Sequence, residues 1–156
     1  VDVKVITKYA DTVMFCLSKG LGCPVGSMLV GPADKMKRAR KIRKLMGGGM
    51  RQIGYLAAAG IYALDHHVDR MADDHTRAKD LGIFLNTLNG VEIDLNTVQT
   101  NMTYFKTKDN EGLIKFLEER DILVIPHHDL IRVTFHLDVD DKDLKRLKEG
   151  IAEFLK

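Results

Sequence analysis

The sequence predicts a mixed α/β fold, and three features point to it. A nearly continuous apolar run at residues 12–17 is typical of a strand buried on both faces, and such strands belong to parallel sheets. A second short apolar run at residues 27–30 predicts another strand. Apolar residues then recur at helical spacing over residues 33–46 and 52–88, which predicts amphipathic helices after these strands.

The first half contains clear signals for where each element ends. An apolar, strand-like pattern starts at Val1 with no initiator Met, so we expect the chain to be part of something longer. Gly31 and Pro32 end the second strand, and we expect Asp34 to cap the helix over 33–46, which three glycines at residues 47–49 then end. Residues 52–88 predict one long or broken helix with an acidic, exposed middle.

The second half predicts a small two-layer lobe. Strands are expected near residues 98–105, 122–125 and 130–136, with a helix over 110–120. Asp140 or Asp141 is expected to cap a final amphipathic helix. The order from residue 90 onward is therefore β-α-β-β-α, and we expect two segments, residues 1–88 and residues 89–156.

Composition is that of an ordinary globular protein. The 156 residues are 45% hydrophobic and 29% charged, which argues against a disordered, collagen-like or membrane chain. No apolar run reaches the ~18 residues of a spanning helix, and nothing resembles a secretory signal. With only Cys16 and Cys23, we expect a reduced, cytoplasmic setting.

Charge is distributed unevenly along the chain. Residues 1–56 carry a formal charge of +8 and residues 57–156 a charge of −6, and seven Lys or Arg lie within residues 35–44. Such asymmetry fits a polyanion site, a subunit interface or a single basic helix. No aromatic residues alternate with these cations, so a solvated or interface face is favoured over nucleic-acid binding.

Lys19 is the first candidate for chemistry. It follows the strand at 12–17 and precedes Gly20, at a sheet edge where α/β proteins bind ligands. Partial desolvation in such a cleft would lower its pKa and free a neutral amine for Schiff-base chemistry. The alternative is a solvated lysine at a strand end.

Two glycine-rich stretches raise the question of phosphate binding. Residues 20–27 fail both the P-loop and the dinucleotide pattern, since no lysine separates Gly26 from Ser27 and no G-x-G-x-x-G occurs. Residues 47–49 are followed by Arg51 at an expected helix start, where the guanidinium and the helix N-terminus suit a phosphate. A plain helix end with a surface arginine is the alternative.

Arg132 lies inside the strand expected at residues 130–136, where a buried guanidinium needs an anion. A carboxylate ligand and an internal salt bridge would serve it equally well. No histidine pairs with a cysteine at zinc spacing, and Cys16 is expected in the core rather than as a nucleophile.

Four stretches of the sequence stand out together: residues 10–27 (ADTVMFCLSKGLGCPVGS), 45–52 (LMGGGMRQ), 56–60 (LAAAG) and 69–75 (DRMADDH). They resemble the pyridoxal-phosphate-dependent low-specificity threonine aldolases, which have the aspartate-aminotransferase-like fold. The first stretch looks like that family's cofactor-lysine segment and the second like its second signature, and the resemblance weakens after about residue 88.

The resemblance implies roles for three residues. Lys19 would form the Schiff base with pyridoxal 5'-phosphate, and Arg51 would reach the cofactor phosphate, of a neighbouring subunit. Arg132 would bind the α-carboxylate of an amino-acid substrate. The family's metal site could involve Ser27, and the assembly would be a homotetramer with no nucleic acid or membrane partner.

Family members are about twice this length, so the chain looks like their C-terminal part: the end of the large cofactor-binding domain, through residue 88, and the small lobe. The implied reaction cleaves threonine to glycine and an aldehyde. The catalytic base is not assigned, and His127, His128 and His136 are bystander candidates. Alternatives are another β-eliminating lyase of this fold and a non-catalytic assembly module that needs an N-terminal partner chain.

Overall fold

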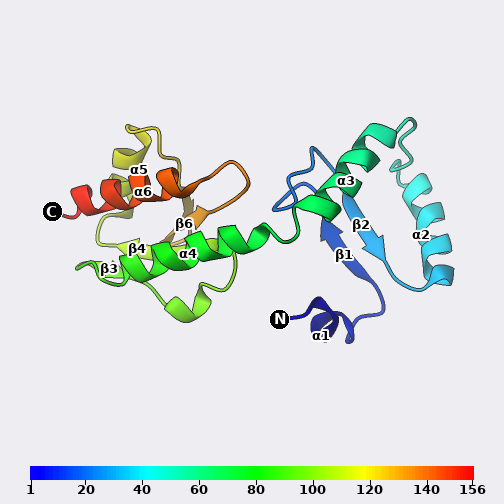
Figure 1. The fold of residues 1–156 in the computed structure, drawn as a ribbon, viewed down its shortest axis with the longest axis horizontal. Coiled ribbons are helices and arrows are strands. Elements are labelled where there is room, and N and C mark those ends of the chain that lie inside the picture. Colours follow the sequence, from blue (N-terminus) through cyan, green and yellow to red (C-terminus); the bar gives the residue numbers. More distant parts are fainter. The chain divides into compact units, whose positions relative to one another are not determined.

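The computed structural model describes all of residues 1–156 and divides into two compact units, unit 1 (residues 1–68) and unit 2 (residues 69–156). Both are built from helices and short antiparallel sheets (Figure 1). The predicted α/β class is confirmed. These compact units divide at residue 68 because the second half of the long helical stretch contributes Ala78, Leu81 and Leu85 to the core of unit 2. The expected domains, residues 1–88 and 89–156, stay a prediction.

Unit 1 consists of a β-hairpin-like pair of strands and three helices. Strands β1 (Val13–Cys16) and β2 (Ser27–Val30) pair along their length, and the helices are α1 (Val3–Thr7), α2 (Ala33–Leu45) and α3 (Gly54–His66). The strand expected from Val1 onward is wrong. The Asp2 side chain accepts a hydrogen bond from the Lys4 amide (2.8 Å) and caps a short helix there.

The expectation of a parallel, doubly buried first strand is also wrong. β1 and β2 run antiparallel, with Cys16 opposite Ser27, because the ten residues between them return the chain directly. Apolar side chains on both strands are exposed, including Met14 (61%) and Leu29 (44%). Nearly continuous apolar sequence therefore occurs here without burial inside unit 1.

Helix α2 ends in a Schellman motif. The Gly47 amide donates to the Lys44 carbonyl (3.2 Å), and the Gly48 amide donates to the Arg43 carbonyl (2.8 Å). Gly47 has a φ of +81°, which explains the first of the three glycines. The expected cap at the other end is wrong: Pro32 is the N-cap residue, and Asp34 lies in the first turn without a capping bond.

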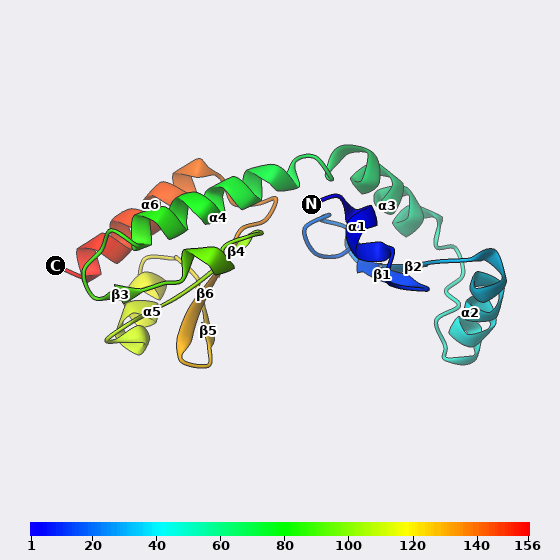
Figure 2. The same cartoon turned by 90° about the horizontal axis from the view of Figure 1, so that it is seen from below.

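Unit 2 is a four-stranded antiparallel sheet covered by three helices. Strand order is β3 (Val91–Glu92), β4 (Met102–Thr107), β6 (Leu130–Thr134) and β5 (Ile125–His127). The helices are α4 (Met71–Leu85), α5 (Asn110–Glu118) and α6 (Asp141–Phe154), with a 3-10 turn at Leu95–Thr97. α4 and α6 lie side by side along the sheet (Figure 2).

The predicted β-α-β-β-α order from residue 90 is confirmed, with three refinements. β4 starts at Met102 rather than near residue 98, and the sequence does not predict β3, which has only two residues. β5 starts at Ile125 rather than near residue 122. Residues 52–88 form a broken helix, as predicted, since α3 ends at His66 and α4 begins at Met71.

The core of unit 2 lies between one face of its sheet and the three helices. Burial alternates along β4 and β6, so that Phe105 and Ile131 face the helices while Tyr104 and Arg132 face away. Thr103 is buried and donates to the Ala78 carbonyl of α4 (3.0 Å). Twelve buried apolar residues make up this core: Ala78, Leu81, Leu85, Phe105, Leu113, Leu117, Ile131, Val133, Phe135, Leu144, Leu147 and Ile151.

A buried carboxylate joins the start of α4 to the start of α6. Asp74 is 1% exposed and accepts from Arg70 (2.5 Å), while Arg77 lies 3.6 Å from it. Arg77 also donates to Asp141 (2.7 Å), and this bond raises the pKa of the Arg77 guanidinium. The predicted exposed acidic stretch therefore contains one carboxylate that is part of the core.

No helix of the chain is both long enough and apolar enough to cross a membrane. Cys16 and Cys23 are free thiols.

Candidate functional site

The loop that carries Lys19 is held closed by backbone hydrogen bonds. The Leu17 amide donates to the Gly26 carbonyl (2.9 Å), and the Cys23 amide donates to the Leu17 carbonyl (3.0 Å). A turn within it is closed by the Gly22 amide, which donates to the Lys19 carbonyl (2.8 Å), and Gly22 adopts a φ of +70°. We call residues 17–26 the lysine loop.

The lysine loop is anchored on α3. Leu17, Leu21 and Cys23 are buried, and Cys23 Sγ lies 3.5 Å from the Ala59 carbonyl. His67, which follows α3, places Nδ1 2.7 Å from the Leu21 carbonyl. The loop is thus fixed on one side while its other residues remain free.

Lys19 itself is exposed, and its amine forms no ion pair or side-chain hydrogen bond. The desolvation expected of a lysine in a cleft is therefore not supplied by the residues of unit 1. The fold does position Lys19, because its unpaired amine is carried by a loop that is anchored on α3.

Arg51 lies three residues before α3 rather than at its first turn. It is exposed and has no carboxylate partner, and the following Gln52 has a φ of +49°. α3 begins without a side-chain cap, so its first amides are unsatisfied by side chains. Arg51 and Lys19 both belong to unit 1. Their roles as cofactor contacts, in which Arg51 would reach the phosphate in a neighbouring subunit, stay a prediction.

Arg132 occupies the centre of the sheet face that the helices leave uncovered. Tyr104 lies opposite it on β4 and Ile125 opposite it on β5. Its Nε is buried without a hydrogen-bond partner, and no carboxylate of the chain pairs with it. The internal salt bridge, one of the two alternatives for this residue, is absent.

The other cation on this face is already paired. Lys106 Nζ lies 3.0 Å from Glu92, and the hydrogen bond to Glu92 raises the pKa of the Lys106 amine. Tyr104 and Lys106 also line a shallow hollow that the segment 92–97 borders. Arg132 is therefore the cation of this face that is free to bind an anion.

His127 lies beside Tyr104 on the same region of the sheet, with ring centroids 5.3 Å apart. His128 follows at the hairpin tip with a φ of +54°. His136 lies 3.7 Å from Asp138, and both are exposed. All three histidines belong to unit 2, whereas Lys19 belongs to unit 1. The expectation that none of them is the catalytic base therefore stays a prediction.

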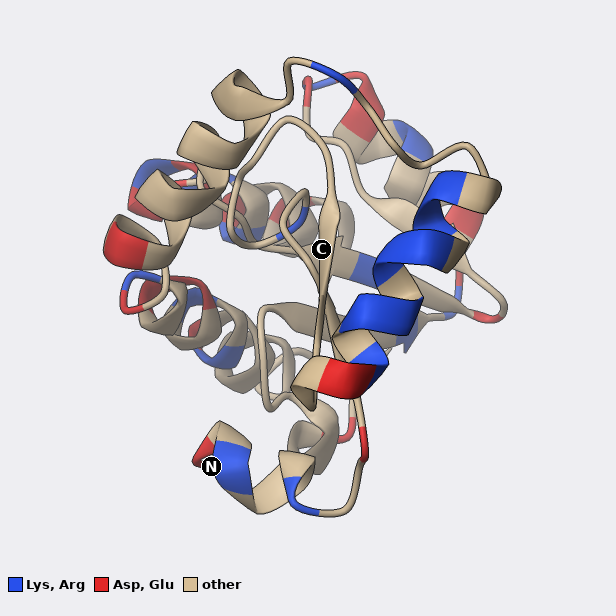
Figure 3. Cartoon of the chain, turned by 90° about the vertical axis from the view of Figure 1, so that its right-hand side faces the viewer, with Lys and Arg blue, Asp and Glu red and all other residues tan.

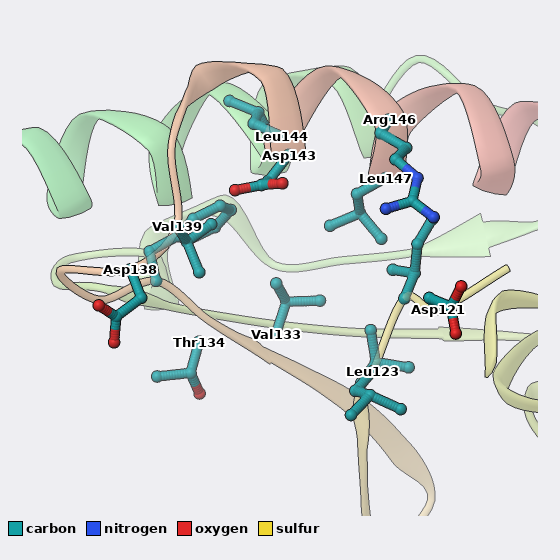
Figure 4. Close-up of a pocket in the computed structure, with 13 residues that line it drawn as sticks. Asp121, Leu123, Val133, Thr134, Asp138, Val139, Asp143, Leu144, Arg146 and Leu147 are labelled. Atoms are coloured by element: carbon teal, nitrogen blue, oxygen red, sulfur yellow. The ribbon is translucent and has the colours of Figure 1, made fainter.

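A hollow of about 260 Å³ lies elsewhere in unit 2, between β6, the segment 121–124 and α6 (Figure 4). Leu144 and Leu147 of α6 line it on one side and Val133 of β6 on the other, and Asp143 lies on the helix side beside Leu144. Asp143 is engaged in capping α6, since its Oδ2 accepts the Asp140 amide (3.0 Å). None of the predicted site residues lines this hollow.

No three His, Cys, Asp or Glu side chains gather where they could hold a metal ion. Ser27, the residue considered for a metal, is exposed at the start of β2, opposite Cys16. Its role stays a prediction.

Comparison with known proteins decides the family. Residues 1–108, more than half of the chain, match the family described as beta-eliminating lyase. The chain belongs to the beta-eliminating lyase family. This matched part contains Lys19 and Arg51, and Arg132 lies beyond it.

Two similar curated relatives of the chain are named low-specificity L-threonine aldolases. The low-specificity L-threonine aldolase 1 of Arabidopsis thaliana is 41% identical over 150 residues, 92% of this chain and 42% of the relative. The low specificity L-threonine aldolase of Escherichia coli K12 is 40% identical over 156 residues, 99% of this chain and 46% of the relative. The chain thus spans less than half the length of the curated relatives it matches.

Solved structures share the fold of this family member at low identity. Serine palmitoyltransferase of Sphingomonas wittichii matches 96% of this chain and 40% of its own, with a TM-score of 0.76 and 18% identity. A PLP-dependent aminotransferase of Streptococcus suis matches 92% of this chain and 41% of its own, with a TM-score of 0.68 and 14% identity. The predicted relation to the aminotransferase-like fold is confirmed.

Sequence reasoning missed two residues that lie close to predicted site residues within their own unit. The sequence pattern assigns no role to His67, and no local pattern signals its bond to Leu21, 46 residues away. Tyr104 was included in a strand without a role. Its alternation with Thr103 and Phe105 places it on the face of Arg132 only once the strand pairing is known.

Proposed function

We propose that this chain is the C-terminal portion of a pyridoxal-phosphate-dependent lyase that cleaves β-hydroxy-α-amino acids, such as threonine or allo-threonine, to glycine and an aldehyde. The observation that carries the proposal is the 40% identity to a low specificity L-threonine aldolase over 99% of the chain. The Lys19 amine, free on an anchored loop, supports it.

The residues of unit 1 fit the cofactor in two respects. Pyridoxal phosphate needs an amine for its aldehyde and a cation for its phosphate, and Lys19 and Arg51 are both exposed without an internal ion pair. Lys19 would hold the cofactor covalently, and Arg51 would hold the phosphate of the cofactor in a neighbouring subunit. When bound, the cofactor supplies an electron sink for the Cα–Cβ bond that breaks.

Arg132 would orient the substrate. Its guanidinium has a buried Nε without a partner and no internal carboxylate, so an incoming α-carboxylate would satisfy it. A bidentate pair of hydrogen bonds from the guanidinium to the carboxylate would orient the amino acid and leave its side chain free to react.

Borohydride trapping tests the cofactor half of the proposal. The chain is incubated with pyridoxal phosphate and reduced, and the modified peptide is mapped by mass spectrometry, with Lys19→Ala as the control. We expect selective labelling of Lys19. Scattered labelling, equal at the exposed Lys37 and Lys41 of α2, would contradict a site in this chain.

A second enzymatic candidate is a β-eliminating lyase that acts on an aromatic amino acid. This candidate is supported by the description of the matching family as beta-eliminating lyase. Threonine would yield glycine and acetaldehyde in the first case, whereas β-elimination from tyrosine or tryptophan would release phenol or indole. Product analysis with these three substrates separates the two activities.

A non-catalytic assembly module is the second class of function. Exposed apolar residues on unit 1, such as Tyr9 (83%), Leu45 (85%) and Tyr55 (91%), favour a partner chain or further copies. We propose a homotetramer with shared sites, or a companion N-terminal chain, in the cytoplasm, where the two thiols stay reduced. Light scattering of the chain with and without a companion measures the assembly.

A further inference from the structure

We propose that His67 is a positioning residue for Lys19. Its Nδ1 lies 2.7 Å from the backbone carbonyl of Leu21, two residues beyond Lys19 in the lysine loop. A carbonyl oxygen only accepts hydrogen bonds, so Nδ1 carries the proton in this pair. The inference rests on the proposed function in one respect, that Lys19 is the residue to be positioned.

Few other contacts fix the lysine loop relative to α3. Its backbone bonds close the loop upon itself and do not fix where it lies. Cys23 Sγ reaches the Ala59 carbonyl at 3.5 Å, but a thiol is a weak donor. Leu17 packs close to Gly60 without a polar bond. The His67 bond is therefore the strongest directional link between the loop and α3.

His67 is itself held firmly. It is the C-cap residue of α3, its amide donates to the Ala63 carbonyl (2.8 Å), and its ring meets the Tyr62 ring edge-on at 5.5 Å. The ring is partly buried, which limits competition from water for the bond to Leu21. A rigid donor at a helix end thus holds a loop that has no secondary structure of its own.

The neighbouring His66 does something different. Its Nδ1 lies 2.9 Å from the Tyr62 carbonyl of its own helix, and its ring stacks on Tyr62 at 4.1 Å. It makes no bond to the lysine loop. The chain therefore supplies a matched control: two adjacent histidines, of which one restrains the loop.

Protonation of His67 does not break the link. In the neutral ring the proton must sit on Nδ1, and a second proton adds at Nε2, so Nδ1 remains a donor in both forms. We therefore expect the restraint to act as a fixed support for Lys19 rather than as a pH switch.

Amide hydrogen exchange of the 156-residue chain tests the restraint directly. In His67→Ala, we expect exchange in the peptide covering residues 17–26 to become about 2- to 10-fold faster, the factor that a net hydrogen bond of this kind provides. His66→Ala should leave that peptide unchanged. His67→Asn, whose side-chain amide can donate from a similar position, should restore most of the protection. Unchanged exchange in His67→Ala, or equal acceleration in His66→Ala, would overturn the proposal.

A second measurement keeps the proposal testable if His67→Ala also loosens α3. Nitrogen-15 spectra of the histidine rings in the unaltered chain report which ring nitrogen carries the proton. We expect His67 to be protonated at Nδ1 at every pH where the chain is folded. A neutral His67 protonated only at Nε2 would refute the bond to Leu21.

Borohydride trapping separates this proposal from the proposed function. If Lys19 is labelled in the unaltered chain, we expect several-fold less labelling in His67→Ala and none of that loss in His66→Ala. Equal labelling in both variants would overturn the positioning role. If Lys19 is never labelled, the proposed function fails in this chain, and the exchange result still decides the restraint.

Discussion

Asp74 illustrates how a single buried charge depends on its partners. The carboxylate is 1% exposed and is held by Arg70, with Arg77 at 3.6 Å. Removing one member of such a group leaves the other charges buried without compensation, and this penalty exceeds the attraction that the intact group contributes. Breaking this group of charges is therefore expected to destabilise the fold by more than the intact group stabilises it.

We expect Asp74→Ala to lower the free energy of unfolding of unit 2 by about 3–5 kcal/mol. Urea denaturation measures this free energy, and amide hydrogen exchange in α4 shows that the loss falls in unit 2. Asp80→Ala is the matched control on the same helix, since the Asp80 side chain is 56% exposed and pairs with Lys148 at 2.8 Å. A surface pair of this kind contributes about 0–1 kcal/mol, so similar losses in both variants would contradict the role of burial.

Arg132 offers a second prediction at the same scale. Its Nε–H is buried and unpaired, so its nitrogen-15 signal should be resolved and should shift when a small carboxylate such as glycine or acetate is added. Arg132→Lys keeps the charge but loses the planar fork, and we expect it to weaken carboxylate binding about 10-fold or more. Lys106→Ala is the control, because Lys106 is already paired with Glu92. Equal losses in both variants would point to a general charge effect.

Helix α6 shows how a local signal fixes an element. Asp140 Oδ1 accepts the amides of Lys142 (2.7 Å) and Asp143 (3.0 Å), and Asp143 bonds back to the Asp140 amide. The bonds from the Asp143 and Lys142 amides hold the pKa of the Asp140 carboxyl below its ordinary value of 3.8. The helix start is thus coupled to the ionisation of one side chain.

This coupling has a definite sign. Because the pKa of Asp140 is lower in the folded than in the unfolded chain, its stabilisation is complete above about pH 4 and is lost as the pH falls through the folded value. In Asp140→Asn, the stability of unit 2 should therefore decrease less as the pH falls. Thermal midpoints between pH 2.5 and pH 6, about the range that brackets a carboxyl group, measure it. Asp138→Asn, which removes a carboxylate that accepts no backbone bond, should leave this decrease unchanged.

Capping and amphipathic patterns are why the elements of unit 2 could be predicted from sequence. Asp140 and the helical spacing of Leu144, Leu147 and Ile151 contain that information locally. The apolar pattern of β1 and β2 does not show which faces of these strands are exposed, because that depends on the chain segments packed against them. The helix at Val3–Thr7 does have a local signal, the cap at Asp2, but the apolar alternation of the same residues suggested a strand.

The candidate site follows the same division. Lys19 and Arg51 lie in recognisable motifs and Arg132 lies in a predicted strand, so all three could be proposed as site residues from the sequence, whereas their local surroundings could not be predicted. The exposure of Lys19 and the unpaired Nε of Arg132 are results of packing. The bond from His67 to Leu21 joins residues 46 positions apart and depends on how the loop folds back on α3.

At the scale of the whole molecule, the two units differ in charge. Unit 1 carries 11 Lys and Arg against four Asp and Glu, whereas unit 2 carries 13 against 18. Most of the excess lies on α2, where Lys and Arg run along the helix (Figure 3), and of its seven cations only Lys35 is ion-paired, with Asp11 at 3.2 Å. The basic face of α2 is thus available for a partner, as the interface alternative predicts.

The units also differ in how complete their cores are. All twelve residues of the main apolar core belong to unit 2. Unit 1 buries four hydrophobic residues, Leu17, Leu21, Cys23 and Ala63, and it carries 20 of the 25 large hydrophobic residues that are exposed. Burial of apolar surface is the main favourable term in folding, so unit 2 has what an independent domain needs and unit 1 does not.

We therefore expect residues 69–156 to fold when expressed alone, with a cooperative thermal transition and a dispersed amide spectrum. Leu81→Ala should lower the free energy of unfolding of this piece by about 2–5 kcal/mol, because Leu81 is fully buried in its core. Residues 1–68 alone should lack a cooperative transition and should associate or aggregate, since their apolar side chains stay exposed. A stable, monomeric piece 1–68 would mean that its exposed surface needs no partner, and the assembly candidate for this chain would then lose its support.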